Sequence, residues 1–150
     1  MSQSDPVMKW LIRRYGHCRL AGREFEPFHM LTNSIISQQL STRAAATIKQ
    51  RLAAIVAPPF HHAGFLTISI DALRSAGLSQ AKARYICELA TRVHDGRLLF
   101  DDLVSKDNET VIAALSESPG IGRWTAEMFL IFGLKRLDVL ALGDPDYSER

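Results

Sequence analysis

The sequence predicts an all-α protein. Helical patterns follow one another along its 150 residues, and no convincing stretch alternates apolar and polar residues as a strand would. The breaks between these patterns are short and rich in turn-forming residues. With 47% hydrophobic and 23% charged residues, the composition is typical of a globular protein and excludes a disordered or fibrous one. The length fits one compact helical domain over residues 1–150.

Two helices are expected in the first part of the chain. Pro27 suits a first helical turn, and the apolar residues that follow it as far as Ile36 lie on one helical face. Ser41 is the expected N-cap of the next helix, which strong helix formers continue until the residue before Pro58. A loop follows, and a weak strand pattern over 65–70 is the main alternative to an entirely helical fold.

A helical hairpin is predicted next. Ser69 precedes a short helix that Gly77 would end in the left-handed region, and Ser79 then caps a long helix that ends at Gly96. Apolar residues recur in this long helix at steps of three and four, so one of its faces is expected in the core. These residues are Ala83, Ile86, Ala90 and Val93.

A second hairpin is predicted over about 108–134, after the acidic linker FDDLVSKD. Asn108 is the expected N-cap of its first helix, the break is the tetrapeptide PGIG, and an apolar helix runs from Arg123 to about Leu134. The two hairpins make a helix–turn–helix unit that repeats along the chain.

The net charge of +2 is small but unevenly distributed, since residues 1–51 carry +5 and residues 101–150 carry −5. A surface that binds a polyanion is therefore expected to draw on the first two thirds of the chain. Solvated helix faces would produce the same pattern, so the charge permits a DNA partner without requiring one.

Several locations and site types are disfavoured. The longest apolar run, 128–134, is far shorter than the roughly 18 residues of a membrane span, and the N-terminus lacks a secretory signal. We therefore expect no membrane association and a cytoplasmic protein. Cys18 and Cys87 form no CxxC pair, which fits thiols in a reducing compartment. The adjacent His61 and His62 are more simply a loop pair than metal ligands, so no side-chain metal site is expected.

The tetrapeptide PGIG has the residues of a phosphate clamp. Gly120 and Gly122 permit positive φ and leave room for a close backbone approach, while Pro119 fixes one torsion. The helix that starts there would turn its unpaired N–H groups outward, where they suit a phosphate oxygen. Such contacts position DNA without reading its sequence. A tight interhelical turn without a ligand is the alternative.

Three strings carry a resemblance to a known family: LSESPGIGRWTAEMFLIFGLKRLDVLALGD, IISQQLSTRAAATI and LRSAGLSQAKARYICELA. They resemble the helix-hairpin-helix DNA glycosylase superfamily over approximately residues 33–144, and most of all its alkylation-repair branch, the 3-methyladenine DNA glycosylase II type. The resemblance implies a base excision repair enzyme. Such an enzyme flips an alkylated purine, for example 3-methyladenine, out of double-stranded DNA and hydrolyses its N-glycosidic bond.

The resemblance places the catalytic carboxylate at Asp144. Breaking the glycosidic bond builds positive charge on the deoxyribose, and a fixed anion beside the ring stabilises that charge and helps to orient water. From the residues alone, Asp144 before Pro145 is an N-cap followed by a proline in the first helical turn, and the two roles are compatible. Asp138 and Asp146 are the nearby alternatives.

The resemblance also implies the type of glycosylase. Bifunctional members carry a Schiff-base lysine at the position of Trp124, so its absence favours a monofunctional enzyme that uses water. Trp124 is similar to the aromatic wall that stacks on a flipped base, and its electron-rich face suits a cationic methylated purine. Met128, one turn later, is a second candidate for this base pocket. Packing in the core is the alternative for both side chains.

The SQQLS segment matches the position from which related enzymes push a side chain into the DNA duplex. Gln39 is the matching residue, Leu40 is the apolar alternative, and Gln38 is an alternative cap for neighbouring backbone. A polar loop with one core leucine explains the same residues. The hairpin residues expected to contact DNA are Gly120, Gly122, Arg123 and Thr125, with a solvated cation as the alternative for Arg123.

Family members continue past the aspartate with helices that close the pocket, whereas six residues follow Asp144 here. This difference leads us to expect a truncated chain and leaves a second hypothesis, a DNA-binding remnant without catalysis. A helical scaffold without a nucleic-acid role is a third. No cofactor is expected, apart from a monovalent cation on the hairpin carbonyls, which the resemblance suggests. The expected protein is a monomer.

Overall fold

The computed structural model describes residues 5–16 and 26–141, and every regular element in these ranges is helical. The all-α prediction is therefore confirmed, and the weak strand over 65–70 does not form. The elements are α1 (Pro6–Tyr15), α2 (Pro27–Ser37), α3 (Thr42–Ala53), the 3₁₀ turn η2 (His62–Phe65), α4 (Ile70–Ser75), α5 (Gln80–His94), α6 (Phe100–Leu103), α7 (Asn108–Ser116), α8 (Arg123–Met128) and the π-helical turn η3 (Phe129–Gly133).

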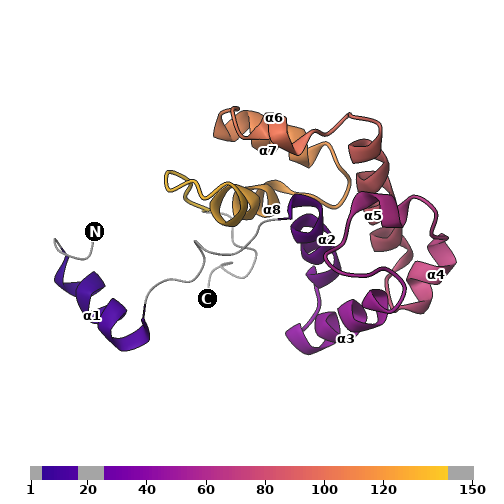
Figure 1. Cartoon of the computed structure of the whole chain (residues 1–150), viewed down its shortest axis with the longest axis horizontal. Helices are drawn as coiled ribbons and strands as arrows, with labels where there is room; N and C mark the ends of the chain where they lie inside the picture. The colour runs from indigo at the N-terminus through magenta and orange to yellow at the C-terminus, as the bar shows by residue number, and fades with distance from the viewer. Residues whose placement is uncertain (1–4, 17–25, 142–150) are drawn as a thin grey trace.

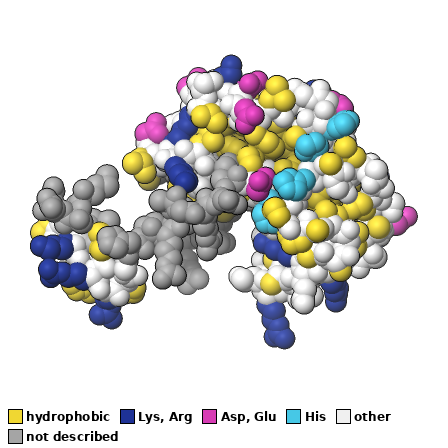
Figure 2. All heavy atoms as spheres, viewed as in Figure 1, with side chains coloured by type: hydrophobic (Ala, Val, Ile, Leu, Met, Phe, Trp, Pro, Cys, Tyr) yellow, Lys and Arg dark blue, Asp and Glu magenta, His cyan; other side chains and the backbone are white. Residues whose placement is uncertain are grey.

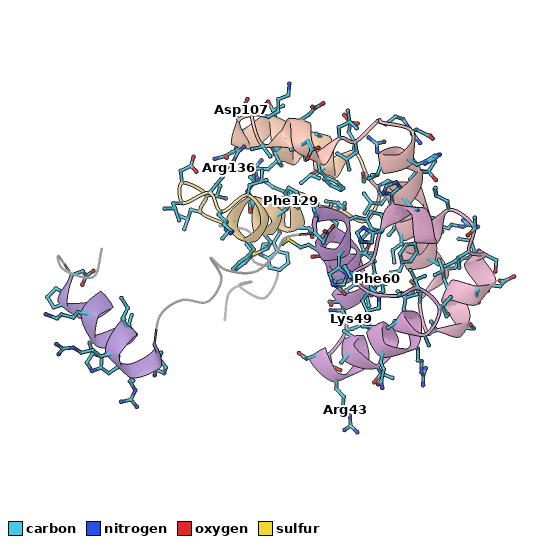
Figure 3. All side chains as sticks on the ribbon, in the orientation of Figure 1. Arg43, Lys49, Phe60, Asp107, Phe129 and Arg136 are labelled. Atoms are coloured by element: carbon cyan, nitrogen blue, oxygen red, sulfur yellow. The ribbon has the colours of Figure 1, made fainter. Side chains whose placement is uncertain are left out.

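Helix α2 lies at the centre of the arrangement (Figure 1). It contacts α3 and α5 on one side and η3 on the other, while α4 packs on α5 and α7 on α8. Its residues Leu31, Ile35 and Ile36 are completely buried. They share one apolar cluster with residues of α5, α7 and η3, including Phe129 (Figure 3). Burying side chains of this size contributes about 1.5–3 kcal/mol each, so α2 fixes both hairpins on a common core.

The predicted helix starts are confirmed at three serines. The side chains of Ser41, Ser69 and Ser79 each accept a hydrogen bond from a backbone N–H three residues later, at 3.2 Å. Gly77 ends the α4 segment with a φ of +106°, as the left-handed stop requires. The core face of α5 is also confirmed, although Val93 is only partly buried.

The N-cap of α7 is Asp107, so the prediction of Asn108 is wrong by one residue. The Asp107 carboxylate accepts hydrogen bonds from both the backbone N–H and the hydroxyl of Thr110, at 2.9 and 2.7 Å. Both residue types cap well, and the second bond from Thr110 favours the carboxylate. The acidic linker also contains the short helix α6, which was not predicted because its four residues show no period.

The predicted apolar helix from Arg123 changes character before it ends. From Phe129 the chain forms a π-helical turn, in which the N–H of Leu134 donates to the carbonyl of Phe129 at 3.1 Å. Arg136 follows, and its guanidinium binds the carbonyls of Leu103, Val104 and Lys106 and the side chain of Asn108. Figure 3 shows Arg136 directed toward the α6–α7 region. The segment after η3 is thereby attached to this region.

Helix α1 was not predicted. Its side chains Val7, Trp10 and Tyr15 are exposed, and the Arg14 guanidinium lies over the Trp10 ring, 5.5 Å from its centroid. Such a contact is a local cation–π interaction within one helix.

Candidate functional site

The α2–α3 turn and the α7–α8 loop line one groove of about 1540 Å³. The two segments are about eighty residues apart in the sequence, and α2 and η3 bring them together. Met128 and Arg123 do not line the groove. Six of the predicted site residues line it: Gln39, Leu40, Gly120, Gly122, Trp124 and Thr125.

The two glycines of the hairpin loop have different roles. Gly120 has a φ of +83°, and a side-chain carbon on it would overlap the ring of Tyr85 from α5. It is therefore required for the close approach of the loop to α5. Gly122 is the N-cap of α8, and a side-chain carbon there would have no atom within 4 Å. No side chain caps the start of α8, so this helix end is open toward the groove.

The α2–α3 turn is a type II β-turn. Gln38 has φ −53° and ψ 131°, Gln39 has φ +55°, and the N–H of Leu40 donates to the carbonyl of Ser37 at 3.2 Å. Gln39 and Leu40 are exposed at its tip. The prediction that SQQLS lies at a helix junction is confirmed, whereas the wedge role stays a prediction.

Gln38 joins this turn to the hairpin loop. Its side-chain Nε2 donates to the carbonyl of Gly120 at 2.7 Å. Lys82, from the first turn of α5, donates to the carbonyls of Ile36 and Gln38 at 2.8 and 2.5 Å. Partial burial lowers the pKa of Lys82. Three elements are thus connected by hydrogen bonds at the groove, and sequence patterns did not reveal this role of Lys82.

The base-pocket candidates differ in exposure. Trp124 is half-buried and lines the groove, so it borders the space that a ligand would occupy. Thr125 is buried at 5% exposure but lies at the groove wall. Met128 is half-buried outside the groove lining. The geometry therefore fits Trp124 as an aromatic wall better than it fits Met128 as a pocket residue.

Arg123 is bound to two carboxylates. Its guanidinium pairs with Glu109 of α7 and with Glu127 one turn along α8, whose side chain is 9% exposed. The hydrogen bond from Arg123 lowers the pKa of Glu109, and the Arg123 charge adds to this effect. The Arg123 side chain is 60% exposed, so the ion pairs cross-brace the hairpin at its surface. Its predicted DNA contact stays a prediction.

A polar cluster on α2 and α3 extends the groove, and it was not predicted. His29, Asn33 and Lys49 line it. The Nδ1 of His29 accepts from the N–H of Phe60 at 2.9 Å, and its Nε2 lies 2.8 Å from the Asn33 amide. Burial, and then the charge of Lys49, lower the pKa of His29. The spacing of His29 and Asn33 by four residues was the available signal, because it places both on one helix face.

The predicted catalytic residue Asp144, and its alternative Asp146, lie outside the described residues. The other alternative, Asp138, is exposed and accepts a hydrogen bond from the side chain of Asn108 at 3.0 Å. It does not line the groove. The geometry therefore gives no support to Asp138.

The described surface is basic near α3. Figure 2 shows Lys and Arg side chains projecting from this end of the molecule, where Figure 3 labels Arg43. Within residues 5–16 and 26–141, no group of three His, Cys, Asp or Glu side chains is arranged to hold a metal ion. None of the helices described here has the length and apolar character that a membrane span requires.

Residues 32–145 match the family described as "HhH-GPD superfamily base excision DNA repair protein". The chain is also 30% identical to "DNA-3-methyladenine glycosylase 1" of Schizosaccharomyces pombe and 34% identical to "DNA-3-methyladenine glycosylase" of Saccharomyces cerevisiae. These matches cover 96% and 78% of the chain. They cover 65% and 43% of the relatives, so the chain spans only part of their length.

Solved structures agree with these matches. A DNA-3-methyladenine glycosidase from Bacillus halodurans superposes with a TM-score of 0.78 at 36% identity, covering 96% of this chain and 71% of that one. A 3-methyladenine DNA glycosylase from S. pombe, in complex with abasic DNA, gives 0.76 at 30% identity, covering 95% and 72%.

Proposed function

Because the chain belongs to the HhH-GPD superfamily of base excision DNA repair proteins, we propose that it is a monofunctional DNA glycosylase. Its proposed substrate is double-stranded DNA with alkylated purines such as 3-methyladenine. One observation carries the proposal: the hairpin loop and the α2–α3 turn line a single groove and are joined by the Gln38–Gly120 hydrogen bond. The names of the relatives from two yeasts support the substrate class.

The groove supplies two kinds of DNA contact in this proposal. The open start of α8 at Gly122 presents backbone N–H groups to a phosphate, with Gly120 and Thr125 in the groove lining beside it and Arg123 outside that lining. The exposed tip of the α2–α3 turn, Gln39 with Leu40 beside it, enters the space that a flipped base leaves. The first contact holds the duplex, and the second keeps it open.

The flipped base then meets an aromatic wall. A purine alkylated on a ring nitrogen carries positive charge, and the half-buried face of Trp124 attracts such a cation more than it attracts an ordinary base. Met128 is kept as a secondary candidate for the same pocket. Because position 124 holds tryptophan and no lysine, water is the proposed nucleophile.

Asp144 is the proposed catalytic carboxylate. As the bond between the base nitrogen and the sugar C1′ breaks, its electron pair leaves with the base and positive charge develops on the sugar. A carboxylate beside the sugar stabilises this charge and orients the water that bonds to C1′. The water loses one proton to the solvent, and the electron pair of the broken bond cancels the positive charge of the alkylated base. The products are a neutral free base and an abasic site.

The test compares the wild type with Asp144→Asn, using Asp138→Asn and Asp146→Asn as matched controls. Release of 3-methyladenine from methylated duplex DNA is followed by counting abasic sites. We expect Asp144→Asn to lower the single-turnover rate by about a hundredfold or more, and each control to lower it by less than about threefold. Equal release by the wild type and Asp144→Asn would overturn the catalytic assignment. Duplex binding without release by any variant would favour the DNA-binding remnant.

The remaining parts of the proposal are a monomeric protein without a cofactor and a monovalent cation on the hairpin carbonyls. Two of these carbonyls, those of Ser118 and Gly120, already accept hydrogen bonds from Ile121 and Gln38. Duplex affinity measured in K⁺ and in tetramethylammonium at equal ionic strength tests the cation. A bound ion would be lost on replacement while the screening stays the same, so the affinity should fall only if the cation is there. Sedimentation with and without a duplex tests the monomer.

A further inference from the structure

The α2–α3 turn has a conformation that its sequence does not favour. The third position of a type II turn needs a positive φ, so glycine or asparagine is usual there, whereas this turn has Gln39 at φ +55°. A type I turn would place the same residue at a φ of about −90°, which suits glutamine better. Contacts elsewhere must therefore hold the type II form.

The two turn types differ mainly in the orientation of one peptide group. Conversion from type II to type I rotates the peptide between Gln38 and Gln39, which carries the Gln38 carbonyl to the other side of the turn. In the structure, Lys82 Nζ donates to this carbonyl at 2.5 Å and to the carbonyl of Ile36 at 2.8 Å. The conversion therefore requires breaking the shorter of the two bonds.

The placement of Lys82 is unfavourable for its own helix. It lies in the first turn of α5, where the helix dipole disfavours a cation, and its side chain is partly removed from water. Its ammonium lies instead at the C-terminal end of α2, whose last carbonyls carry negative partial charge and lack helical partners. Two of its three protons are used there, so Lys82 is engaged by the turn although it lines the groove.

From these contacts we infer that Lys82 is a positioning residue, which locks the α2–α3 turn in its type II form. The lock sets the directions of Gln39 and Leu40 relative to the hairpin loop, to which Gln38 is bonded through Gly120. Its consequence for DNA rests on the proposed function, because only there does the tip of the turn enter the duplex. The lock itself is a property of the free protein.

The first test measures the turn without DNA, by NMR. A ψ of 131° at Gln38 brings its α-proton close to the amide proton of Gln39, so type II gives a strong NOE between them and type I a weak one. We expect Lys82→Met to weaken this NOE by about threefold or more, and Lys106→Met, an exposed lysine outside the groove, to leave it unchanged. An unchanged NOE in Lys82→Met would overturn the inference.

Two further variants keep the test decisive if Lys82→Met is poorly folded. Lys82→Gln retains a donor for one carbonyl and should give an intermediate NOE, and a wild-type intensity there would contradict the lock. Lys82→Met/Gln39→Gly removes the cost of the positive φ and should recover the strong NOE. A weak NOE in this double variant would show that Lys82 acts through something other than the turn.

The second test measures the consequence for DNA. The ratio of the Kd for an intact duplex to the Kd for an abasic-site duplex reports how well the tip fills the gap. We expect Lys82→Met to lower this ratio by about tenfold, Lys106→Met to leave it unchanged, and Lys82→Met/Gln39→Asn to recover part of it. A ratio near one in the wild type would contradict the proposed function, while the NOE would still decide whether Lys82 locks the turn. A wild-type ratio retained in a Lys82→Met protein of altered NOE would overturn the positioning role.

Discussion

The α4–α5 and α7–α8 hairpins share one plan but differ at the start of their second helices. Each has a left-handed glycine in its turn, Gly77 and Gly120. In the first hairpin the Ser79 side chain caps α5, whereas in the second Gly122 leaves α8 without a side-chain cap. A helix start that is satisfied internally has a structural role, and one that is left open beside a groove is available to a ligand. The two hairpins therefore have different roles, although their sequence patterns repeat.

The two hairpins should differ most in how much stability they lose when the left-handed glycine of each is replaced by alanine. Gly120→Ala combines an unfavourable φ with overlap on the Tyr85 ring, so we expect a loss of about 3–5 kcal/mol in unfolding free energy. At Gly77 the nearest atom to an added carbon is the flexible Ile48 side chain at 3.1 Å, and about 1–3 kcal/mol is expected. Urea unfolding measures both. Equal losses would show that the approach to Tyr85 is easily relaxed.

The second largest difference should be in the stability that is lost when an ion pair of each hairpin is broken. Arg123→Gln leaves the nearly buried Glu127 without its partner, so it should lower the free energy of unfolding by clearly more than the matching variant of the first hairpin does. Arg74→Gln breaks only an exposed pair with Asp71 in the first hairpin and should cost less than about 0.5 kcal/mol. Both variants remove one positive charge, so each controls for the other. A cost for Arg123→Gln as small as that for Arg74→Gln would mean that Glu127 finds another partner or water.

Exchanging the caps separates stability from DNA binding. Gly122→Ser has room for its side chain and should gain a few tenths of a kcal/mol, while duplex affinity falls by about fivefold because the new hydroxyl competes with a phosphate. Ser79→Gly should lose a similar stability and leave affinity unchanged. Affinity is measured by anisotropy at several salt concentrations. An affinity loss in Ser79→Gly alone would reverse the roles that we assign to the hairpins.

The smallest effect concerns pH. The hydrogen bond from the Thr110 backbone lowers the pKa of Asp107 below its ordinary value of 3.8, whereas the serine caps of the first hairpin do not titrate. Because the folded pKa is the lower one, the stabilisation of α7 is complete above pH 3.8 and is lost as the pH falls through the folded pKa. Amide exchange of Thr110 should therefore accelerate there, while that of Lys82 is affected less. Asp107→Ser should abolish this pH dependence.

Most of the predicted helix starts are confirmed because their signals are local, whereas the helix that was expected to continue to the residue before Pro58 ends at Ala53. Ser41, Ser69 and Ser79 cap helices through bonds that span three residues, and such bonds can be inferred from spacing. The choice between Asp107 and Asn108 as the N-cap of α7 could not be inferred from spacing, because it depended on a second hydrogen bond from the Thr110 side chain.

The site was predictable only in part, because some of its features are local in the sequence and others are contacts between distant segments. The hairpin glycines and Trp124 lie in one recognisable string, and the structure places them in one groove. The Gln38–Gly120 bond and the grip of Lys82 on the turn join residues more than forty positions apart. No periodic pattern encodes such contacts, since they depend on how α2, α5 and the hairpin are packed.

Arg136 has a consequence for how the molecule opens. Its guanidinium joins three carbonyls around the end of α6 to the segment that follows η3, and these groups are thirty or more residues apart in the sequence. Neither segment can move away from the other without leaving these carbonyl acceptors unpaired. The segment after η3 and the α6–α7 connection should therefore open as one cooperative unit, with common protection of their amides.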